Sequence, residues 1–191
     1  MTTTIEKPFQ KSPFKVPPQD LSAEQALLGA ILLKPEALNE IVESISPDSF
    51  YSLKHKMIYR AMLALYEKNE PIDIVSLTSY LKEKKSLDQI GGRSYITEIT
   101  NTVPTTANIK HYAGLVSKKA ALRRLIESAD TILDLGYNEA DSVDSILDKA
   151  EKIIFGLANF SKKTFVSIKD TLTEAWDRFD RLHKSKDGIR G

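Results

Sequence analysis

The residues best able to do chemistry in this chain are its histidines, glycines and serines, and their spacing argues against an active site. His55, His111 and His183 are far apart and lack an HExxH-like ligand spacing, so they predict no metal site. None of the eight glycines begins a GxxxxGK[ST] or G-x-G-x-x-G loop for nucleotide phosphates, and no serine stands in a G-x-S-x-G elbow. The chain has no cysteine, which excludes a thiolate nucleophile, a thiolate metal site and disulfides. We therefore expect no catalytic residue, metal or cofactor in these 191 residues.

Two features could suggest chemistry but have simpler interpretations. His55 has apolar neighbours on a helix, and a structural role is favoured over a catalytic one. The stretch KSLDQIGGRS could form an anion-binding nest, yet a turn between two helices explains Gly91 and Gly92 better. The carboxylates lie on expected helix surfaces, where solvation accounts for them.

Composition places the chain among soluble globular proteins. Hydrophobic residues make up 41% and charged residues 28%, with a net charge of +1, so the overall balance indicates neither nucleic-acid nor membrane binding. The N-terminus lacks the apolar core of a signal peptide, and the longest apolar run, Ala26 to Leu33, is too short to cross a bilayer. We expect a cytoplasmic protein with no membrane partner, which the absence of cysteine fits.

The first half of the chain predicts an all-α globule. Residues 1–16 form an expected flexible tail, and residues 17–104 carry about five short helices with no convincing strand alternation. The expected helix starts are a capping box of Ser22 and Gln25, a first-turn Pro35, a third helix over about residues 53–68, a cap at Asp73, and Gly91–Gly92 before a short helix.

Beyond Pro104 there is no further proline, and residues 105–160 predict a long antiparallel helical hairpin. Its first helix should run from Thr106–Asn108 to Leu135, with Gly136 as a left-handed cap, and Ser142 should cap the second helix. Two helices form a poor core, so we expect the hairpin to self-associate through apolar residues that include Ile132, Leu133, Ile146, Ile153 and Leu157.

Charge is sorted along this hairpin. Residues 109–126 contain five lysines and arginines and no acid, whereas residues 127–151 contain eight acids and one lysine. We interpret both halves as solvated faces rather than as a nucleic-acid site, because an acidic tip would repel phosphate.

The chain ends with an amphipathic helix that has no evident partner. A hinge over residues 161–167 should precede a linker helix over residues 168–184, and residues 185–191 form a polar loop. The apolar stripe of this helix consists of Ile168, Leu172, Ala175, Trp176, Phe179 and Leu182.

Five stretches in order carry a resemblance to a known family: PPQDLSAEQALLGAIL, DSFYSLKHKMIY, PIDIVSL, LDQIGGRSYITEI and NTVPTTANIKHYAGLVSKKA. The combination of AEQ-x-x-LG with downstream PID and ANI-x-x-YA is specific, although each piece alone would be weak. It closely resembles the N-terminal region of bacterial replicative DNA helicases of the DnaB family. The match covers residues 17 to about 125 well, and the hairpin and terminal helix by position and pattern.

This resemblance implies a ring-forming hexameric helicase that moves on single-stranded DNA at the replication fork, with ATP and Mg²⁺ used by a RecA-like domain. In the family, the N-terminal globule and hairpin pair into a collar, a trimer of dimers, which receives primase; a helicase loader is a further partner. The motor, with its P-loop and arginine finger, is missing from these residues. The helix over residues 168–184 then corresponds to the linker helix that docks on the ATPase domain of the adjacent subunit.

Two other functions are considered beside this one. A stand-alone helical adaptor, such as a helicase loader or inhibitor that copies the collar fold, should end with its last helix packed or capped. A small helical enzyme would need convergent polar residues, which the sequence does not assemble. A chain that ends in a loop after an unpartnered helix favours the helicase hypothesis over both of these, and a GxxxxGK[ST] motif beyond Gly191 would support it.

Overall fold

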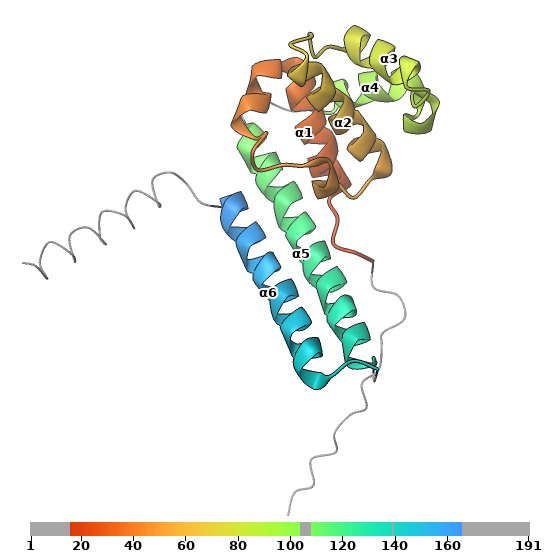
Figure 1. Cartoon of the computed structure of the whole chain (residues 1–191). Helices are drawn as coiled ribbons and strands as arrows, with labels where there is room; N and C mark the ends of the chain where they lie inside the picture. Colours follow the sequence, from red (N-terminus) through yellow and green to blue (C-terminus); the bar gives the residue numbers. More distant parts are fainter. Residues whose placement is uncertain (1–15, 104–107, 139, 166–191) are drawn as a thin grey trace, which may run out of the picture.

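The described residues of this computed structural model are 16–103, 108–138 and 140–165, with side chains described as far as Leu157, and they contain helices and no strand. This confirms the all-α prediction. A globule built from the first four α-helices lies at one end of two long antiparallel helices (Figure 1). In chain order the elements are α1 (Leu21–Leu33), η1 (Pro35–Glu40), η2 (Pro47–Ser49), α2 (Leu53–Glu67), α3 (Ile74–Glu83), η3 (Asp88–Ile90), α4 (Gly92–Asn101), α5 (Ile109–Gly136) and α6 (Val143–Phe165).

Helix α1 forms the centre of the globule, and its apolar side chains explain why it lies there. It packs against α4, η1, α2 and the first half of α5, and Leu27, Leu28 and Ile31 are completely buried. Three or four such side chains at about 1.5–3 kcal/mol each make this helix a major source of stability.

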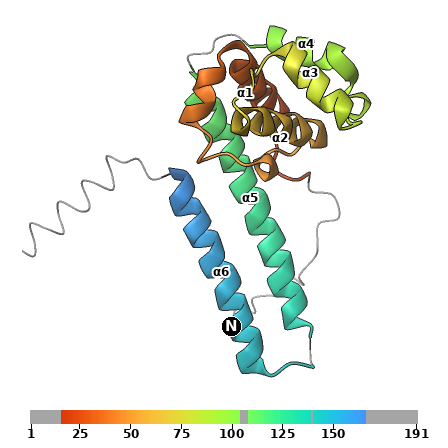
Figure 2. The ribbon, with the colours of Figure 1, turned by 45° about the horizontal axis from the view of Figure 1, so that its top comes forward.

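The first half of α5 belongs to the same core. Ile109, Ala113, Val116 and Ala120 are buried at three- and four-residue steps, so one face of this half packs on the globule. The second half runs past the globule and pairs with α6, as the view in Figure 2 also shows. Helix α5 is therefore shared between the globule and the hairpin.

Gly29 allows α1 and α4 to approach each other. A Cβ atom at this position would lie 2.5 Å from the carbonyl oxygen of Ile99 and would also collide with the side chain of Val103. Because a backbone oxygen cannot rotate away, any larger residue here would push the two helices apart.

The helix starts agree with the predictions in part. The predicted capping box of Ser22 and Gln25 is wrong: α1 begins at Leu21, and the Asp20 carboxylate accepts a hydrogen bond from the Ala23 N–H at 3.0 Å. The predicted cap at Asp73 is confirmed, since its carboxylate accepts from the Ser76 N–H at 2.7 Å, and this bond lowers the pKa of Asp73.

Two other local predictions have different outcomes. Pro35 begins a 3₁₀ helix that is followed by turns, rather than an α-helix, and Leu38, Ile41 and Ile45 of this segment are buried. Gly91 and Gly92 both have positive φ, at 99° and 73°, and connect η3 to α4. This conformation is the helix–turn–helix junction that the sequence favoured over an anion-binding nest.

The hairpin prediction is confirmed in its main feature and wrong at two boundaries. Helix α5 includes Gly136 and ends in a right-handed cap at Tyr137, so Gly136 is not a left-handed cap. Ser142 caps α6 as predicted, accepting from the Ser145 N–H at 3.4 Å. Helix α6 continues to Phe165 and so extends into the predicted hinge over residues 161–167. The predicted linker helix over residues 168–184 and the loop over residues 185–191 lie outside the described residues.

The close approach at Gly29 generates a prediction with a matched control in the same chain. Gly29→Ala should lower the free energy of unfolding by about 1–3 kcal/mol because the added methyl group meets the Ile99 backbone. Gly114→Ala should instead raise it by about 0.5–1 kcal/mol, since Gly114 is helical and nothing lies within 4 Å of the new Cβ. Urea unfolding followed by circular dichroism measures both, and equal effects of the two substitutions would contradict this account.

Candidate protein-docking surface on the helical hairpin

A buried carboxylate organises the globule next to the hairpin. Glu24 is 2% exposed, and its Oε1 accepts from the Tyr51 N–H at 2.6 Å while Oε2 accepts from the Ser52 N–H at 3.2 Å. The Nδ1 atom of His55 lies 2.6 Å from the same Oε2, and His55 Nε2 lies 2.7 Å from the hydroxyl of Tyr95. These contacts fix the segment that leads into α2.

The roles of His55 and Gln25 follow from this network. The Gln25 amide nitrogen donates to the Tyr95 oxygen at 3.2 Å, which leaves the Tyr95 hydroxyl proton for His55 Nε2. In this arrangement the Nδ1–H of His55 donates to Glu24 Oε2. His55 is 1% exposed and bonded on both nitrogens, so its predicted structural role is confirmed.

Arg123 joins the hairpin to this organised segment. From the middle of α5 its Nη1 donates to the carbonyl oxygen of Pro18 at 2.8 Å, and its Nη2 donates to that of Ser49 at 2.6 Å. The guanidinium also lies 5.7 Å from the centre of the Tyr51 ring, as a cation–π pair. Burial lowers the pKa of Arg123, while the negative charge of Glu24 opposes that shift. Arg123 therefore sets where the hairpin leaves the globule.

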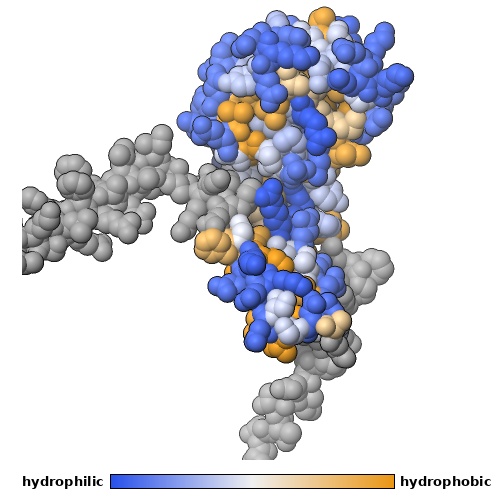
Figure 3. Space-filling model, viewed as in Figure 1, coloured by the Kyte–Doolittle hydropathy of each residue, from blue (hydrophilic) through white to orange (hydrophobic). Residues whose placement is uncertain are grey.

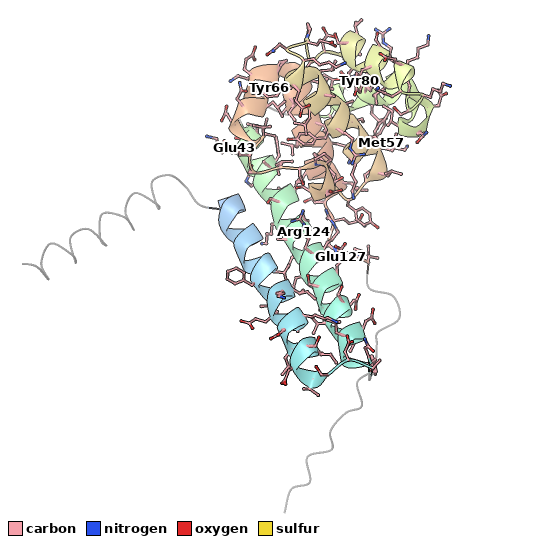
Figure 4. All side chains as sticks on the ribbon, viewed as in Figure 1. Glu43, Met57, Tyr66, Tyr80, Arg124 and Glu127 are labelled. Atoms are coloured by element: carbon pink, nitrogen blue, oxygen red, sulfur yellow. The ribbon has the colours of Figure 1, made fainter. Side chains whose placement is uncertain are left out.

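The residues predicted for self-association lie on both helices of the hairpin and are only partly exposed. Ile132, Leu133, Ile146, Ile153 and Leu157 are all half-buried. Ile153 and Leu157 line a hollow of about 420 Å³ together with Arg124 and Glu127 of α5, which are labelled in Figure 4. Ile153 and Leu157 therefore face α5, and self-association through the five residues stays a prediction.

A second set of apolar residues, which the sequence did not single out for this role, faces solvent. Val143, Leu147 and Ile154 are spaced at four and seven residues on α6, so they share one face, and Leu147 is 61% exposed. Orange side chains are visible along the hairpin in Figure 3. The hairpin stripe, as we define it, consists of the exposed apolar residues Leu122, Leu125, Ile126, Val143, Leu147, Ile154 and Phe155.

The hairpin stripe is a candidate protein-docking surface because of its size and position. Isolated exposed apolar residues are common on proteins, but seven of them gathered on one helix pair indicate an interaction surface. The basic residues nearer the globule are partly engaged: Arg123 bonds the globule, and Lys110 pairs with Glu40 at 3.3 Å.

Other kinds of site find little support in the described part of the chain. No group of three or more histidines, cysteines or acids there could hold a metal ion. No helix in these ranges is both long enough and apolar enough to cross a membrane.

The model of the DnaB-like helicase N-terminal domain matches residues 16–118, more than half of the chain. The chain belongs to this family. Among curated relatives, the replicative DNA helicase DnaC of Bacillus subtilis is 46% identical over 178 residues, which cover 93% of this chain and 39% of that protein. The replicative DNA helicase DnaB of Geobacillus stearothermophilus is 39% identical over the same shares of the two chains. The chain thus spans about two-fifths of the length of these relatives.

Solved structures show the same family relationship. The N-terminal domain of the DnaB helicase from Mycobacterium tuberculosis has a TM-score of 0.71 at 39% identity, covering 74% of this chain and 99% of that chain. A DnaB-like replicative helicase, in a structure that describes its interactions with primase, has a TM-score of 0.63 at 27% identity. That match covers 84% of this chain and 35% of that chain.

One motif of the family resemblance, AEQ-x-x-LG, has a structural role in this fold. In AEQ-x-x-LG, Glu24 and Gln25 build the buried network, Leu28 is in the core, and Gly29 permits the approach of α4. Glu24 could have been noticed from its position, because it shares a helix with the core-facing Leu27, Leu28 and Ile31. Arg123 gave no such signal, because its acceptors are backbone carbonyls distant in sequence.

The contacts of Arg123 predict that it limits the motion of the hairpin relative to the globule. Arg123→Ala should broaden the distance distribution between spin labels at Lys84→Cys and Asp144→Cys and should cost about 1–3 kcal/mol of stability, because two hydrogen bonds from a charged donor are lost. Since the chain has no native cysteine, both labels are site-specific, and excess unlabelled chain prevents distances between copies. The exposed Lys118→Ala is the control, and an unchanged distribution in Arg123→Ala would refute this role.

Proposed function

We propose that this chain is the N-terminal assembly and protein-docking part of a hexameric replicative DNA helicase. Its hairpins pair two copies, three pairs build the collar as a trimer of dimers, and the collar docks primase. Unwinding of duplex DNA at the fork, with ATP and Mg²⁺, then resides in a RecA-like domain of the parent protein. The parent ring encloses single-stranded DNA, takes part with a helicase loader, and works in the cytoplasm.

The observation that carries this proposal is the hairpin stripe on a chain of this family. Seven apolar side chains at about 1.5–3 kcal/mol each, if fully buried, are comparable with the roughly 4–15 kcal/mol that association costs. The relatives that span 93% of this chain are replicative helicases, which supports this role over a stand-alone adaptor or loader. The described polar network around Glu24 is buried and internally satisfied, so it offers little to an enzyme hypothesis.

The last part of the chain has a proposed role of its own. Residues 168–184 are proposed as the linker helix that docks on the ATPase domain of an adjacent subunit. Its contact residues would be the apolar stripe of Ile168, Leu172, Ala175, Trp176, Phe179 and Leu182. A stripe of this size is typical of a helix that gains its stability from a partner.

The proposal predicts that the exposed and half-buried residues of the hairpin behave differently. Leu147→Asp with Ile154→Asp should give monomers that keep their helical content, because these side chains face solvent in one copy. Ile132→Asp with Ile153→Asp should lose helical content in the hairpin, because these side chains are half-buried in one copy. Sedimentation equilibrium and circular dichroism measure the two effects.

A matched control adds the same charge outside the hairpin stripe. Thr131→Asp with Ala140→Asp changes exposed positions by the same two negative charges and should leave the association constant within about threefold. An unsubstituted chain that stays monomeric at high micromolar concentration would refute self-association through the hairpin.

Docking of primase depends, in this proposal, on assembly of the collar. The unsubstituted chain should therefore bind a primase in titration calorimetry, with a stoichiometry below one primase per chain if the site lies between copies. Leu147→Asp with Ile154→Asp should weaken that binding at least about tenfold, since the paired surface is lost. Equal primase affinity for the monomeric variant would show that a single globule is sufficient and would contradict docking between copies.

A further inference from the structure

A groove on the globule has a defined shape and lies away from the hairpin. It is a hollow of about 700 Å³ between η1, which contributes Pro35 and Glu36, and the segment that joins α2 to α3, which contributes Glu70 and Pro71. Tyr66, at the end of α2, forms part of its wall and is labelled in Figure 4 at the top of the globule, away from α6. We call this hollow the acidic groove.

The walls of the acidic groove are held by specific contacts. The Tyr66 hydroxyl donates to Asn39 Oδ1 at 2.5 Å, which joins α2 to η1 across the groove. Asn69 adopts a left-handed conformation with φ of 55° and reverses the chain after α2. Ile72 is buried in the core and anchors the next segment. These contacts make the groove a built feature of the fold.

The chemistry of the lining defines what the groove can bind. Glu36, Glu70 and Asp73 contribute three carboxylates, and the lining includes no lysine or arginine. Beside them, Tyr66 is 38% exposed and Pro71 is also exposed, so the surface offers aromatic and apolar contacts. A basic peptide segment with proline and aromatic side chains complements this combination.

The N-terminal segment of this chain has that composition. Residues 7–15 read KPFQKSPFK, with three lysines, no acid, and two Pro-Phe pairs five residues apart. The segment was interpreted from the sequence only as a flexible tail, and the proposed helicase role leaves it without a function.

The number of residues between this segment and the acidic groove decides whether the segment can bind the groove of its own chain. The 13 residues of α1 separate Leu21 from η1 by about 20 Å, and residues 16–20 run away from η1 in Figures 1 and 2, adding roughly 15 Å. Spanning about 35 Å takes roughly ten extended residues. Only residues 1–6 would then reach the groove, and these contain none of the lysines and neither Pro-Phe pair.

We propose that the acidic groove of one chain binds residues 7–15 of a second copy. The lysines of the segment pair with the carboxylates of Glu36, Glu70 and Asp73, and its Pro-Phe pairs pack on Tyr66 and Pro71. This contact joins globules, so it is separate from association through the hairpin stripe and does not depend on the proposed helicase function.

Disulfide trapping between two different full-length variants tests this contact. Ser12→Cys places a thiol in the segment, and Lys68→Cys places one beside the groove, in a chain that has no other cysteine. Mixed under mild oxidation, the two variants should form a disulfide between copies. Glu36→Lys with Glu70→Lys in the groove chain should slow this reaction at least about fivefold, and 0.5 M salt should also slow it.

Charge reversal on both sides makes the test specific. Reversing Lys7, Lys11 and Lys15 to Glu should slow trapping by the unsubstituted groove, and combining this variant with the reversed groove should restore the rate. Asp144→Lys with Asp148→Lys, on the hairpin, should leave the rate unchanged. The proposal is overturned if trapping ignores the groove charges, if the double reversal does not restore it, or if it occurs only within a chain that carries both cysteines.

Discussion

The burial of one charged side chain, Glu24, constrains the rest of the structure. A carboxylate removed from water costs several kcal/mol unless its oxygens are satisfied, and here two backbone N–H groups and His55 satisfy them. Those bonds dictate the path of the chain before α2, and that path presents the Ser49 carbonyl and the Tyr51 ring to Arg123. The position at which the hairpin leaves the globule therefore follows from a residue at the start of α1.

The shared helix α5 extends this constraint over the whole molecule. A 28-residue helix is about 42 Å long, and its first half is fixed by burial of Ile109, Ala113, Val116 and Ala120. Its second half carries part of the hairpin stripe, so the stripe is presented at a fixed angle to the globule without a flexible joint. The proposed collar would need this property, because an error in angle would be repeated in every copy.

The periodicity of apolar residues was sufficient to predict the architecture, but not to predict which residues of the hairpin are exposed. Apolar residues at helical spacing identified the all-α fold, the globule and the hairpin, because each helix must bury one face. In the hairpin, however, apolar residues occupy two adjacent faces, and sequence cannot tell which one the partner helix covers. Ile132 and Ile153, which the sequence assigns to self-association, are half-buried in one chain, whereas Leu147 and Ile154 are exposed. The role of the first pair in self-association stays a prediction.

The remaining differences arise from contacts between residues distant in sequence. Arg123 bonds Pro18, whose carbonyl group no side-chain pattern reveals. The cap of α1 is Asp20 rather than Ser22, because the helix already begins at Leu21 and the Asp20 carboxylate accepts from the N–H of Ala23, three residues on. Gly136 continues its helix because the chain has six more residues in which to turn, so no left-handed residue is required.

The two proposed contact surfaces differ in the physics that would stabilise them. Burial of the hairpin stripe is driven by the hydrophobic effect, which salt leaves largely intact or strengthens. A contact in the acidic groove depends on exposed charges, and these are screened over about 8 Å at physiological ionic strength. Pairing of hairpins would therefore persist under conditions that release the N-terminal segments. Because the groove lies on the globule and the stripe on the hairpin, one can open without disturbing the other, and ionic strength alone would separate the two modes of association.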